Sequence, residues 1–569
     1  MNHIKIPVGR SGFADIRNNG YYYIDKSRLI QALLKTEVTQ VTLITRPRRF
    51  GKTLNMSMLS EFFDIRKNSR MLFDGLDITK DGSLCSRWMN QYPTLFLTLK
   101  NVDGLDFEGA YAQLTTVIAE LYKKHFTLAE STCIRKADQT LFYKIATQKA
   151  APTEIKNSIL KLMQLLYVYY RKPVILLIDE YDVPLAKASE KGYYPQMLDV
   201  IKGMLQATKD NEFLKLAVIT GCLRIAKESV FTGTNNFVAD TISDARLDEY
   251  FGFTQAETDK LLADTGFTSH RSELKEWYDG YRFGDFDVYC PWDVMNHVSR
   301  LLINPCTKPA SYWGNTSDNA IIRSFIDLTG SGTTKKIERL LSGGTIEEKI
   351  EDDLTYDYLH SSEQNLWSIL YLTGYLTNAR PETAKNQETT NNCVTLKIPN
   401  IEIRAIFEKT IQKWFTEKSR EWDRQKLFTA VWNKNEEMIT SEMTRLLRQT
   451  ISYHDYKEDF YHAFFAGIFA GAGYDVESNK ERGEGRSDIV VKDYAKDRAA
   501  VFEVKYVKTP DSLVNACEQA VRQIDARAYA EALYDDYADV ICYGIAFYKK
   551  RCLVMCQKYL ADSSPVSLS

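Results

Sequence analysis

The sequence has few of the features that mark secreted, zinc-clustered or membrane-spanning proteins. Its 10 cysteines are scattered and none stands in a CxxC pair, which argues against a disulfide framework or a zinc site. The amino terminus has no basic segment followed by an apolar run, and the apolar stretch 463–472 is too short to cross a bilayer. We therefore expect an unprocessed cytoplasmic protein that does not enter membranes.

A large excess of charge of either sign is also absent. The formal net charge is −2 over 569 residues, of which 44% are hydrophobic and 26% are charged. This composition is typical of globular proteins, and the length exceeds what one hydrophobic core serves. It excludes a protein that coats nucleic acid through bulk charge, so any contact with a polyanion has to come from a local cluster such as Arg46, Arg48 and Arg49.

What the sequence does contain is a phosphate-binding pattern near its start. Residues 46–53 read Arg-Pro-Arg-Arg-Phe-Gly-Lys-Thr, after a β-rich run at 41–45 and before a helical pattern. In such a loop backbone N–H groups bind phosphates, the lysine reaches the terminal ones and the threonine hydroxyl ligates Mg²⁺. The alternative is a basic turn that binds any anion or caps a helix. The residues expected to contact a nucleotide are Arg49, Gly51, Lys52 and Thr53.

A second pattern follows where an apolar strand ends in Asp179 and Glu180. This ending places Asp179 near Mg²⁺ and Glu180 where it polarises the attacking water. The next strand ends at Thr220, which either senses the terminal phosphate or caps the following turn. Arg224 is a candidate arginine finger if the protein works as a homo-oligomer; otherwise it is a surface or salt-bridged arginine.

An aromatic segment lies in the middle of the chain. Residues 277–284 read Trp-Tyr-Asp-Gly-Tyr-Arg-Phe-Gly. Glycines between aromatic residues indicate a tightly packed turn, and stacked aromatics usually belong to a core. We expect this segment to form a structural corner buried against the ATPase core.

The carboxyl-terminal part contains a separate set of carboxylates. Asp488 ends the run Gly-Arg-Ser-Asp, and Glu503 and Lys505 belong to Phe-Glu-Val-Lys. Because side chains alternate across a strand, Glu503 and Lys505 share one face, and a hairpin would bring Asp488 beside it. The carboxylates would hold Mg²⁺ or Mn²⁺, and Lys505 would orient water or steady the charge on a phosphate. The alternative is a solvated surface salt bridge.

Three neighbouring residues would assist this site. Glu458, on the preceding helix, adds a metal ligand or holds one in place. Gln519 and Gln523 are four residues apart on the later helix and share a face, where a glutamine contacts the scissile phosphate or positions Lys505. Together these groups are the minimum equipment for phosphodiester hydrolysis.

These motifs resemble the bacterial AAA-ATPase-like proteins that carry a C-terminal PD-(D/E)xK nuclease-superfamily domain. The resemblance rests on residues 46–53, on Leu-Leu-Ile-Asp-Glu-Tyr-Asp at 176–182, on 219–236, and on the Gly-Arg-Ser-Asp and Phe-Glu-Val-Lys runs. It covers nearly the whole chain and implies ATP binding and a nuclease fold, with no settled substrate.

The chain departs from the family pattern at three places. Arg46 stands where phosphate loops have a glycine, and Pro47 lacks an N–H, so the loop offers fewer donors. Ser487 replaces the proline that gives the superfamily its name. That proline is not a metal ligand. Asn479 takes the place of a glutamate that often precedes the Gly-Arg-x-Asp turn.

The order of motifs predicts an α/β protein with several regions. A P-loop NTPase fold with a doubly wound parallel sheet would come first, and an α/β restriction-endonuclease-like fold last. The expected divisions are an AAA-like ATPase domain at 1–245, a helical lid-like region at 246–345, a small winged-helix-like region at 346–405, a helical connector at 406–450 and the nuclease-like domain at 451–569.

Three functions are compatible with the sequence. The leading one is an ATP-binding ATPase coupled to a Mg²⁺-dependent or Mn²⁺-dependent nuclease that acts on DNA. The second is a nucleotide-controlled switch that grips nucleic acid without cleaving it. The third is a small-molecule kinase-like ATPase with a structural carboxyl-terminal domain, which ranks last because no acceptor pocket motif is present.

Overall fold

The computed structural model describes residues 4–35, 39–224, 237–314, 336–337, 339–351, 354, 363–379, 393–410, 425–450, 465–470, 472–482, 485–526, 530–549 and 551–557. The chain forms two compact units. The first unit comprises residues 1–328 and 343–407, and the second comprises residues 329–342 and 408–569. Each unit has its own central sheet and its own hydrophobic core.

The first unit is built on a five-stranded parallel sheet with the order β2-β3-β4-β1-β5. Its strands are β1 (Val41–Thr45), β2 (Thr94–Thr98), β3 (Val174–Asp179), β4 (Leu214–Gly221) and β5 (Phe237–Asp240). Register aligns Ile178 with Ile219 and Thr45 with Gly221, so the carboxyl ends of β3, β4 and β1 meet at one edge. The predicted doubly wound parallel sheet is confirmed.

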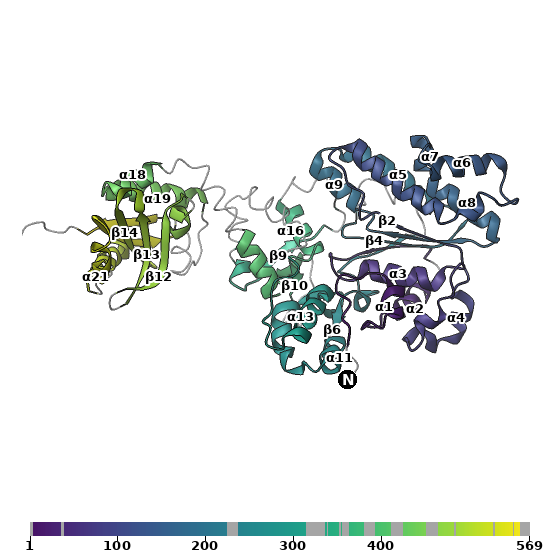
Figure 1. Ribbon diagram of the computed structural model, residues 1–569, viewed down its shortest axis with the longest axis horizontal. Helices are drawn as coiled ribbons and strands as arrows, with labels where there is room; N and C mark the ends of the chain where they lie inside the picture. The colour runs from purple at the N-terminus through teal and green to yellow at the C-terminus, as the bar shows by residue number, and fades with distance from the viewer. Residues whose placement is uncertain are drawn as a thin grey trace, which may run out of the picture. The chain divides into compact units, whose positions relative to one another are not determined.

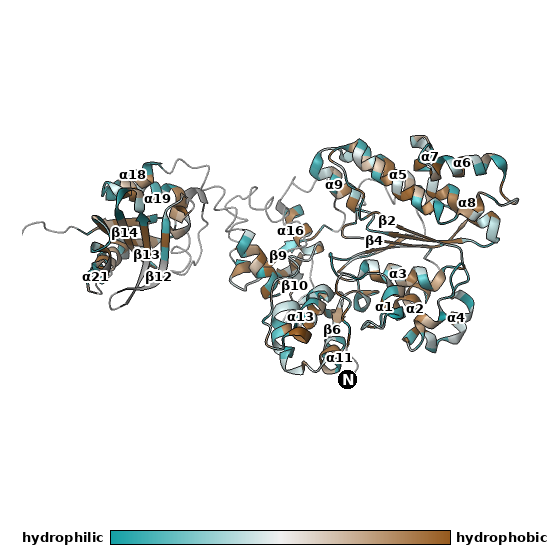
Figure 2. Cartoon of the chain, viewed as in Figure 1, coloured by the Kyte–Doolittle hydropathy of each residue, from teal (hydrophilic) through white to brown (hydrophobic). Residues whose placement is uncertain are grey.

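Helices cover both faces of this sheet (Figure 1). One layer contains α1 (Phe13–Asn18), α2 (Arg28–Lys35), α3 (Lys52–Phe63) and α4 (Gly82–Trp88), and the other contains α5 (Phe107–Lys123), α6 (Lys136–Ala146), α7 (Pro152–Lys156), α8 (Ser158–Tyr170) and α9 (Val183–Lys191). All residues of β1 and β3 are buried. Strands buried on both faces are hydrophobic throughout, and Figure 2 shows the sheet in brown between helices whose outer faces are teal.

The middle of the chain, also part of the first unit, adds two small sheets and several helices. One sheet has the order β6-β8-β7, and the other has the order β10-β11-β9. The elements are β6 (Phe253–Thr254), α11 (Gln255–Thr265), α12 (Arg271–Tyr278), β7 (Tyr281–Phe283), β8 (Phe286–Tyr289), α13 (Pro291–Ile303), β9 (Ile346–Lys349), α16 (Glu363–Leu372), β10 (Thr377–Asn378) and β11 (Cys393–Lys397). α16 is followed by β10 and β11, which pair antiparallel.

The aromatic segment forms a buried corner, as predicted. Tyr278, Tyr281 and Phe283 are each at most 2% exposed. Phe50, from the loop after β1, packs edge-on against Tyr281, with ring centroids 4.9 Å apart, and lies 5.0 Å from the Phe283 ring. The corner therefore supports the segment in which the phosphate-binding pattern lies.

The second unit is built on a mixed five-stranded sheet with the order β12-β13-β14-β15-β16. Its strands are β12 (Asp475–Arg482), β13 (Gly485–Asp493), β14 (Arg498–Tyr506), β15 (Asp539–Tyr548) and β16 (Arg551–Cys556). β14 and β15 run parallel, and the crossover between them contains α21 (Leu513–Ala526), which packs on β14, β15 and β16. This topology fits a nuclease-like domain.

Two helices predicted to form a connector belong to this second core. α18 (Gln425–Trp432) and α19 (Glu436–Thr450) bury Leu427, Val431, Ile439 and Met443 in the same cluster as residues of β13, β14 and β15. The Tyr543 hydroxyl on β15 also donates a hydrogen bond to the Val431 carbonyl. A boundary at residue 450 therefore does not separate two cores, because the apolar faces of these amphipathic helices are covered by the sheet.

In the part of the chain that the structure describes, no helix combines the length and apolar character needed to cross a membrane.

Candidate functional site

The phosphate-binding pattern forms a turn between β1 and α3. Arg49 and Gly51 adopt left-handed backbone conformations, with φ of 73° and 85°, and α3 begins at Lys52. Glycine adopts this conformation without the steric cost that a side chain imposes, so Gly51 ends the loop at the helix start. The predicted strand–loop–helix arrangement is present.

Arg46, which stands in place of the usual first glycine, points into the protein. Its side chain is fully buried, and a guanidinium nitrogen lies 2.6 Å from Asp240 Oδ1 at the end of β5. The guanidinium also donates to the Thr45 and Asp240 carbonyls and lies over the rings of Phe251 and Phe283. The expectation that Arg46 contributes to a basic cluster for polyanions is therefore wrong, because its charge is neutralised in a buried ion pair with Asp240.

Lys52 lies inside the loop. Its ammonium donates hydrogen bonds to the carbonyls of Arg46 (2.9 Å) and Pro47 (3.0 Å), and it lies 3.9 Å from a Glu180 carboxylate oxygen. Burial would lower the pKa of Lys52, but Cys222, Glu180 and nearby aspartates raise it above its usual value. The side chain is thus a buried cation at the entrance to α3.

Asp179 accepts hydrogen bonds from three threonine hydroxyls. Thr53 (2.9 Å) and Thr98 (3.2 Å) donate to one carboxylate oxygen, and Thr220 (2.8 Å) donates to the other. Burial and the charge of Glu180 raise the pKa of the Asp179 carboxyl. The structure therefore brings together three residues that the sequence placed in the phosphate loop (Thr53) and at two strand ends (Asp179 and Thr220).

Two residues of this arrangement escaped the sequence analysis. Thr98 ends β2 and is the register partner of Asp179, so its position follows only once the strand order is known. Asp182 is buried after β3 and accepts hydrogen bonds from the N–H groups of Cys222 (2.8 Å) and Leu223 (3.0 Å). It ties the segment after β4, where the half-buried Arg224 lies, to the Asp179–Glu180 turn.

Glu180 differs from its neighbours because it faces a cavity. Its backbone is left-handed, with φ of 57°, and its side chain is 19% exposed. A left-handed conformation is uncommon for a non-glycine residue and often marks a functional site. The turn therefore buries Asp179 and Asp182 while it presents the carboxylate between them.

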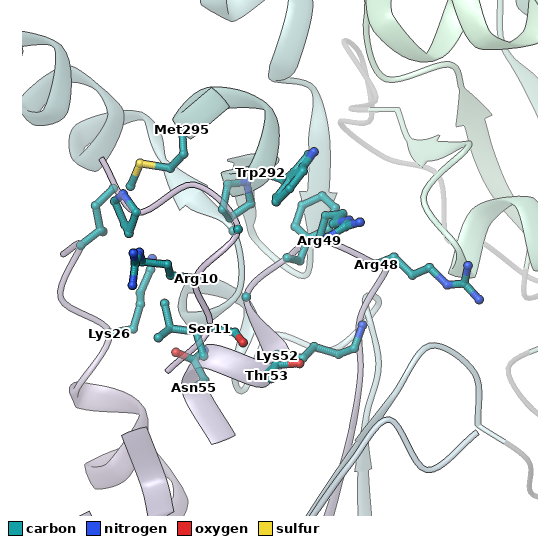
Figure 3. A pocket seen from close by; sticks show the side chains of 18 of the residues that line it. Arg10, Ser11, Lys26, Arg48, Arg49, Lys52, Thr53, Asn55, Trp292 and Met295 are labelled. Carbon is teal, nitrogen blue, oxygen red and sulfur yellow. The ribbon is translucent and has the colours of Figure 1, made fainter. Parts of the chain in front are cut away.

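The cavity in front of the loop has a volume of about 530 Å³. Its lining includes cationic and polar side chains, among them Arg10, Lys26, Arg48, Arg49, Lys52, Thr53 and Lys100. It also includes apolar side chains, among them Val8, Ile24, Phe253, Pro291 and Met295. Figure 3 shows the Arg49 side chain beside Trp292, and the guanidinium carbon lies 4.2 Å from the ring centroid. A cavity of this size, lined by both cationic and apolar groups, suits a nucleotide.

In the second unit, Glu503 and Lys505 share one face of β14. Lys505 Nζ lies 3.0 Å from Glu503 Oε1, while Val504 between them is buried in the core. The Glu503 side chain is 1% exposed and that of Lys505 is 25% exposed, so the pair is not the solvated surface salt bridge of the alternative interpretation.

Asp488 occupies the strand position next to this pair. It lies in β13 directly before Ile489, whose register partner Phe502 directly precedes Glu503. The predicted hairpin is thus present, with Asp488 and Glu503 at opposing positions of neighbouring strands. The Asp488 side chain and the whole of Glu458 fall outside the described part of the chain, so their predicted roles stay predictions.

The two glutamines lie on α21, as expected. Gln519 is exposed and its amide lies 3.4 Å from Asn515 Oδ1, while Gln523 is half-buried. The face of α21 that packs on the sheet contains Ala516, Cys517, Ala520 and Ile524. Contact of either glutamine with a phosphate remains a prediction.

Histidines form one group that their spacing in sequence did not indicate. His270, Glu273 and His297 each place a ligand atom within 4.8 Å of the others. His270 and Glu273 are already ion-paired at 3.0 Å, and three ligands are fewer than the four that closed structural zinc sites use. We assign this group no role.

Two known families match separate parts of the chain. Residues 7–231 match the family described as predicted AAA-ATPase, and residues 456–557 match the PD-(D/E)XK nuclease superfamily. The chain therefore contains an AAA-ATPase-like domain and a C-terminal PD-(D/E)XK nuclease-superfamily domain.

A relative of similar length matches most of the chain. The chain is similar to the "Uncharacterized protein in vnfD 5'region" of Azotobacter chroococcum mcd 1, with 24% identity over 547 residues. The match covers 93% of this chain and 94% of that protein, so it spans both units.

Proposed function

We propose that the first unit binds and hydrolyses ATP with Mg²⁺, and that the second unit is a metal-dependent nuclease for DNA whose activity depends on the nucleotide. The observation that carries the proposal is the network in which Asp179 joins Thr53, Thr98 and Thr220 beneath a basic cavity. Carboxylate and hydroxyl oxygens are the ligands that Mg²⁺ prefers.

The residues of the first unit have distinct roles in this proposal. Thr53 and Asp179 hold the ion, directly or through water, and the bound Mg²⁺ neutralises phosphate charge. Lys52 leaves the loop carbonyls to contact the terminal phosphates, and Glu180, the carboxylate that faces the cavity, orients the attacking water and accepts its proton. Thr220 keeps Asp179 in position. The apolar side chains of the cavity lining contact the base.

The nuclease proposal rests on the buried carboxylate of Glu503 and its neighbours. Glu503 and Asp488 supply hard oxygen ligands for Mg²⁺ or Mn²⁺, which lowers the pKa of a bound water. Lys505, held at 3.0 Å from Glu503, orients that water or steadies the charge that develops on the phosphate. DNA is the proposed substrate, and the match of residues 456–557 to the PD-(D/E)XK nuclease superfamily supports it.

Cleavage assays on the full chain test the proposal. Plasmid and single-stranded DNA are incubated with Mg²⁺ or Mn²⁺, with and without ATP, and the native protein is compared with Glu503→Ala and Lys52→Ala. We expect Glu503→Ala to abolish cutting while ATP hydrolysis persists. We expect Lys52→Ala to abolish ATP hydrolysis and to change the rate of cutting.

Two other results would redirect the assignment. If nothing cuts under any condition while ATP and DNA still bind, the second unit is a nucleotide-controlled binding module. If Lys52→Ala cuts at the native rate with or without ATP, the two activities are independent and the coupling part of the proposal is wrong.

A further inference from the structure

The outward side of the phosphate loop is held by the middle of the chain. Trp313 Nε1 lies 3.4 Å from the Arg48 carbonyl oxygen, and the Cys290 thiol lies 3.9 Å from the Arg49 carbonyl oxygen. Gly374, with φ of 87°, lies against Pro47, and an added Cβ there would meet the proline ring at 3.0 Å. All of these residues belong to the first unit.

These contacts decide which way the loop amides point. In a planar trans peptide the carbonyl and the following N–H point in opposite directions. Donors that draw the Arg48 and Arg49 carbonyls outward therefore turn the N–H groups of Arg49 and Phe50 the other way, and both residues line the cavity. In a loop where Pro47 offers no N–H, these two donors add to the N–H groups at the start of α3.

Trp313 is itself fixed by a buried carboxylate. Glu402 is fully buried and one of its oxygens accepts hydrogen bonds from the N–H groups of Tyr312 (2.6 Å) and Trp313 (2.7 Å). Asn400, two residues earlier, accepts from the Ile403 N–H (3.0 Å) and donates to the Asp279 carbonyl (2.9 Å). A buried carboxylate with two such donors sets the position of the backbone that carries the indole.

Packing completes the support. The Trp313 ring is 2% exposed and meets the Tyr375 ring edge-on at 4.7 Å between centroids. Tyr375 follows Gly374, so the residue that packs on Pro47 and the residue that packs on Trp313 are adjacent in the chain. The loop is therefore linked to its support at two neighbouring points, Pro47 and Arg48.

We propose that Trp313 and Glu402 are positioning residues for nucleotide binding: Glu402 fixes Trp313, and Trp313 orients the Arg48–Arg49 peptide toward the phosphates. The inference rests on the proposed ATP binding of the first unit. It makes the segment 399–407, at the end of that unit, a point from which nucleotide affinity is controlled.

The test is a titration of the full chain with a fluorescent ATP analogue in Mg²⁺, together with steady-state ATP hydrolysis. Trp313→Phe keeps an aromatic ring but removes the N–H, and loss of one hydrogen bond weakens binding by about three- to tenfold. We expect Kd and KM to rise by this factor while kcat stays within about twofold, since no group of the chemical step is removed.

Two further variants separate positioning from general destabilisation. Trp367→Phe, at a fully buried tryptophan of α16, is the matched control and is expected to leave Kd unchanged. Glu402→Gln keeps an oxygen acceptor and loses the charge, so a rise in Kd of about twofold is expected without a change in the far-ultraviolet circular dichroism.

The outcomes are distinct. If the native chain binds no ATP, the proposed function fails and this inference fails with it. If the native chain binds ATP and both Trp313→Phe and Glu402→Gln bind it equally well, the positioning role is wrong while the proposed function stands. An equal rise in Kd in Trp313→Phe and Trp367→Phe would also overturn the positioning role, because replacement of any buried tryptophan would then be enough to weaken ATP binding.

Discussion

Asp179 in the first unit and Glu503 in the second are both carboxylates on buried strands, yet their surroundings are opposite. Asp179 accepts hydrogen bonds from three neutral hydroxyls, whereas Glu503 is paired with the Lys505 ammonium at 3.0 Å. Each is at most 1% exposed. The difference therefore lies in the charge of the partners and not in the depth of burial.

This difference predicts different requirements for a metal ion. Hydroxyl donors orient a carboxylate without cancelling its charge, so Asp179 and Thr53 can attract a cation by themselves. A lysine cancels most of the charge of its partner, so the proposed Glu503 site needs a second carboxylate, and Asp488, at the opposing strand position, is the proposed source. The first site is assembled from strand ends of one sheet, and the second depends on a hairpin.

The largest expected effect is on the lysine-paired carboxylate. Glu503→Ala removes a metal ligand, and we expect DNA cleavage to fall by about a thousandfold or more because metal-held charge supplies several kcal/mol. Gel assays of plasmid nicking measure the effect. Glu518→Ala, at an exposed position of α21, is the control and should cut at the native rate. Full cleavage by Glu503→Ala would remove this residue from the site.

The second prediction concerns Glu180, which follows Asp179 in the site of the first unit. Glu180→Gln keeps the size of the side chain but cannot accept a proton, so ATP hydrolysis is expected to fall by about a hundredfold or more. ATP binding should remain, since Thr53 and Asp179 are untouched. Phosphate release measures ATP hydrolysis, and nucleotide titration measures ATP binding. Glu190→Gln, on the exposed side of α9, is the control, and unchanged hydrolysis in Glu180→Gln would exclude its role as base.

The comparison is sharpened by removing one hydroxyl. Thr220→Val leaves a buried Asp179 oxygen without its donor, and loss of a partner for a buried acceptor costs about 1–3 kcal/mol. Urea unfolding in the presence of a chelator measures this loss. Thr140 is an exposed threonine on α6, so Thr140→Val measures the effect of a threonine-to-valine substitution where no buried hydrogen bond is lost. Equal stability of Thr220→Val and the native chain would show that Asp179 does not depend on this hydrogen bond.

The smallest expected effect concerns a carboxyl that serves neither site. Burial, and then the charge of Glu402, raises the pKa of Asp293 well above its usual value. The folded state thus keeps this proton to a higher pH than the unfolded state does, so the contribution of Asp293 to stability is most favourable at low pH and falls as the pH rises above the unfolded pKa. Asp293→Asn should flatten this decline between pH 5 and 8 in thermal unfolding. An unchanged pH profile would contradict the prediction.

The sequence was sufficient for the elements that local patterns define. Val41–Thr45, the Gly51 turn and the run that ends at Asp179 are marked by a β-rich or apolar run, by a turn-forming residue or by a chemical motif. The order of these elements predicted the parallel sheet. The face shared by Glu503 and Lys505 followed from strand alternation alone.

Residues that act through tertiary contacts were not predictable in this way. Thr98 joins Asp179 only because β2 is the neighbour of β3, and threonine at a strand end is common. Arg46 looked like a surface cation, because nothing near it in sequence indicates that Asp240 would meet it 194 residues later. α18 and α19 have the amphipathic pattern of any connector, and only the sheet that covers them identifies their core.

The ion pair between Arg46 and Asp240 also constrains how the sequence can diverge. Removal of Asp240 would leave the buried Arg46 charge unpaired, at a cost of about 3–5 kcal/mol, whereas Asp240 without Arg46 would keep Arg246 at 3.2 Å as a partner. A change at position 240 therefore passes through an unstable intermediate unless position 46 changes as well. Positions 46 and 240 are expected to vary together among related proteins, and their joint state would record whether a lineage kept the charged anchor of the loop or replaced it.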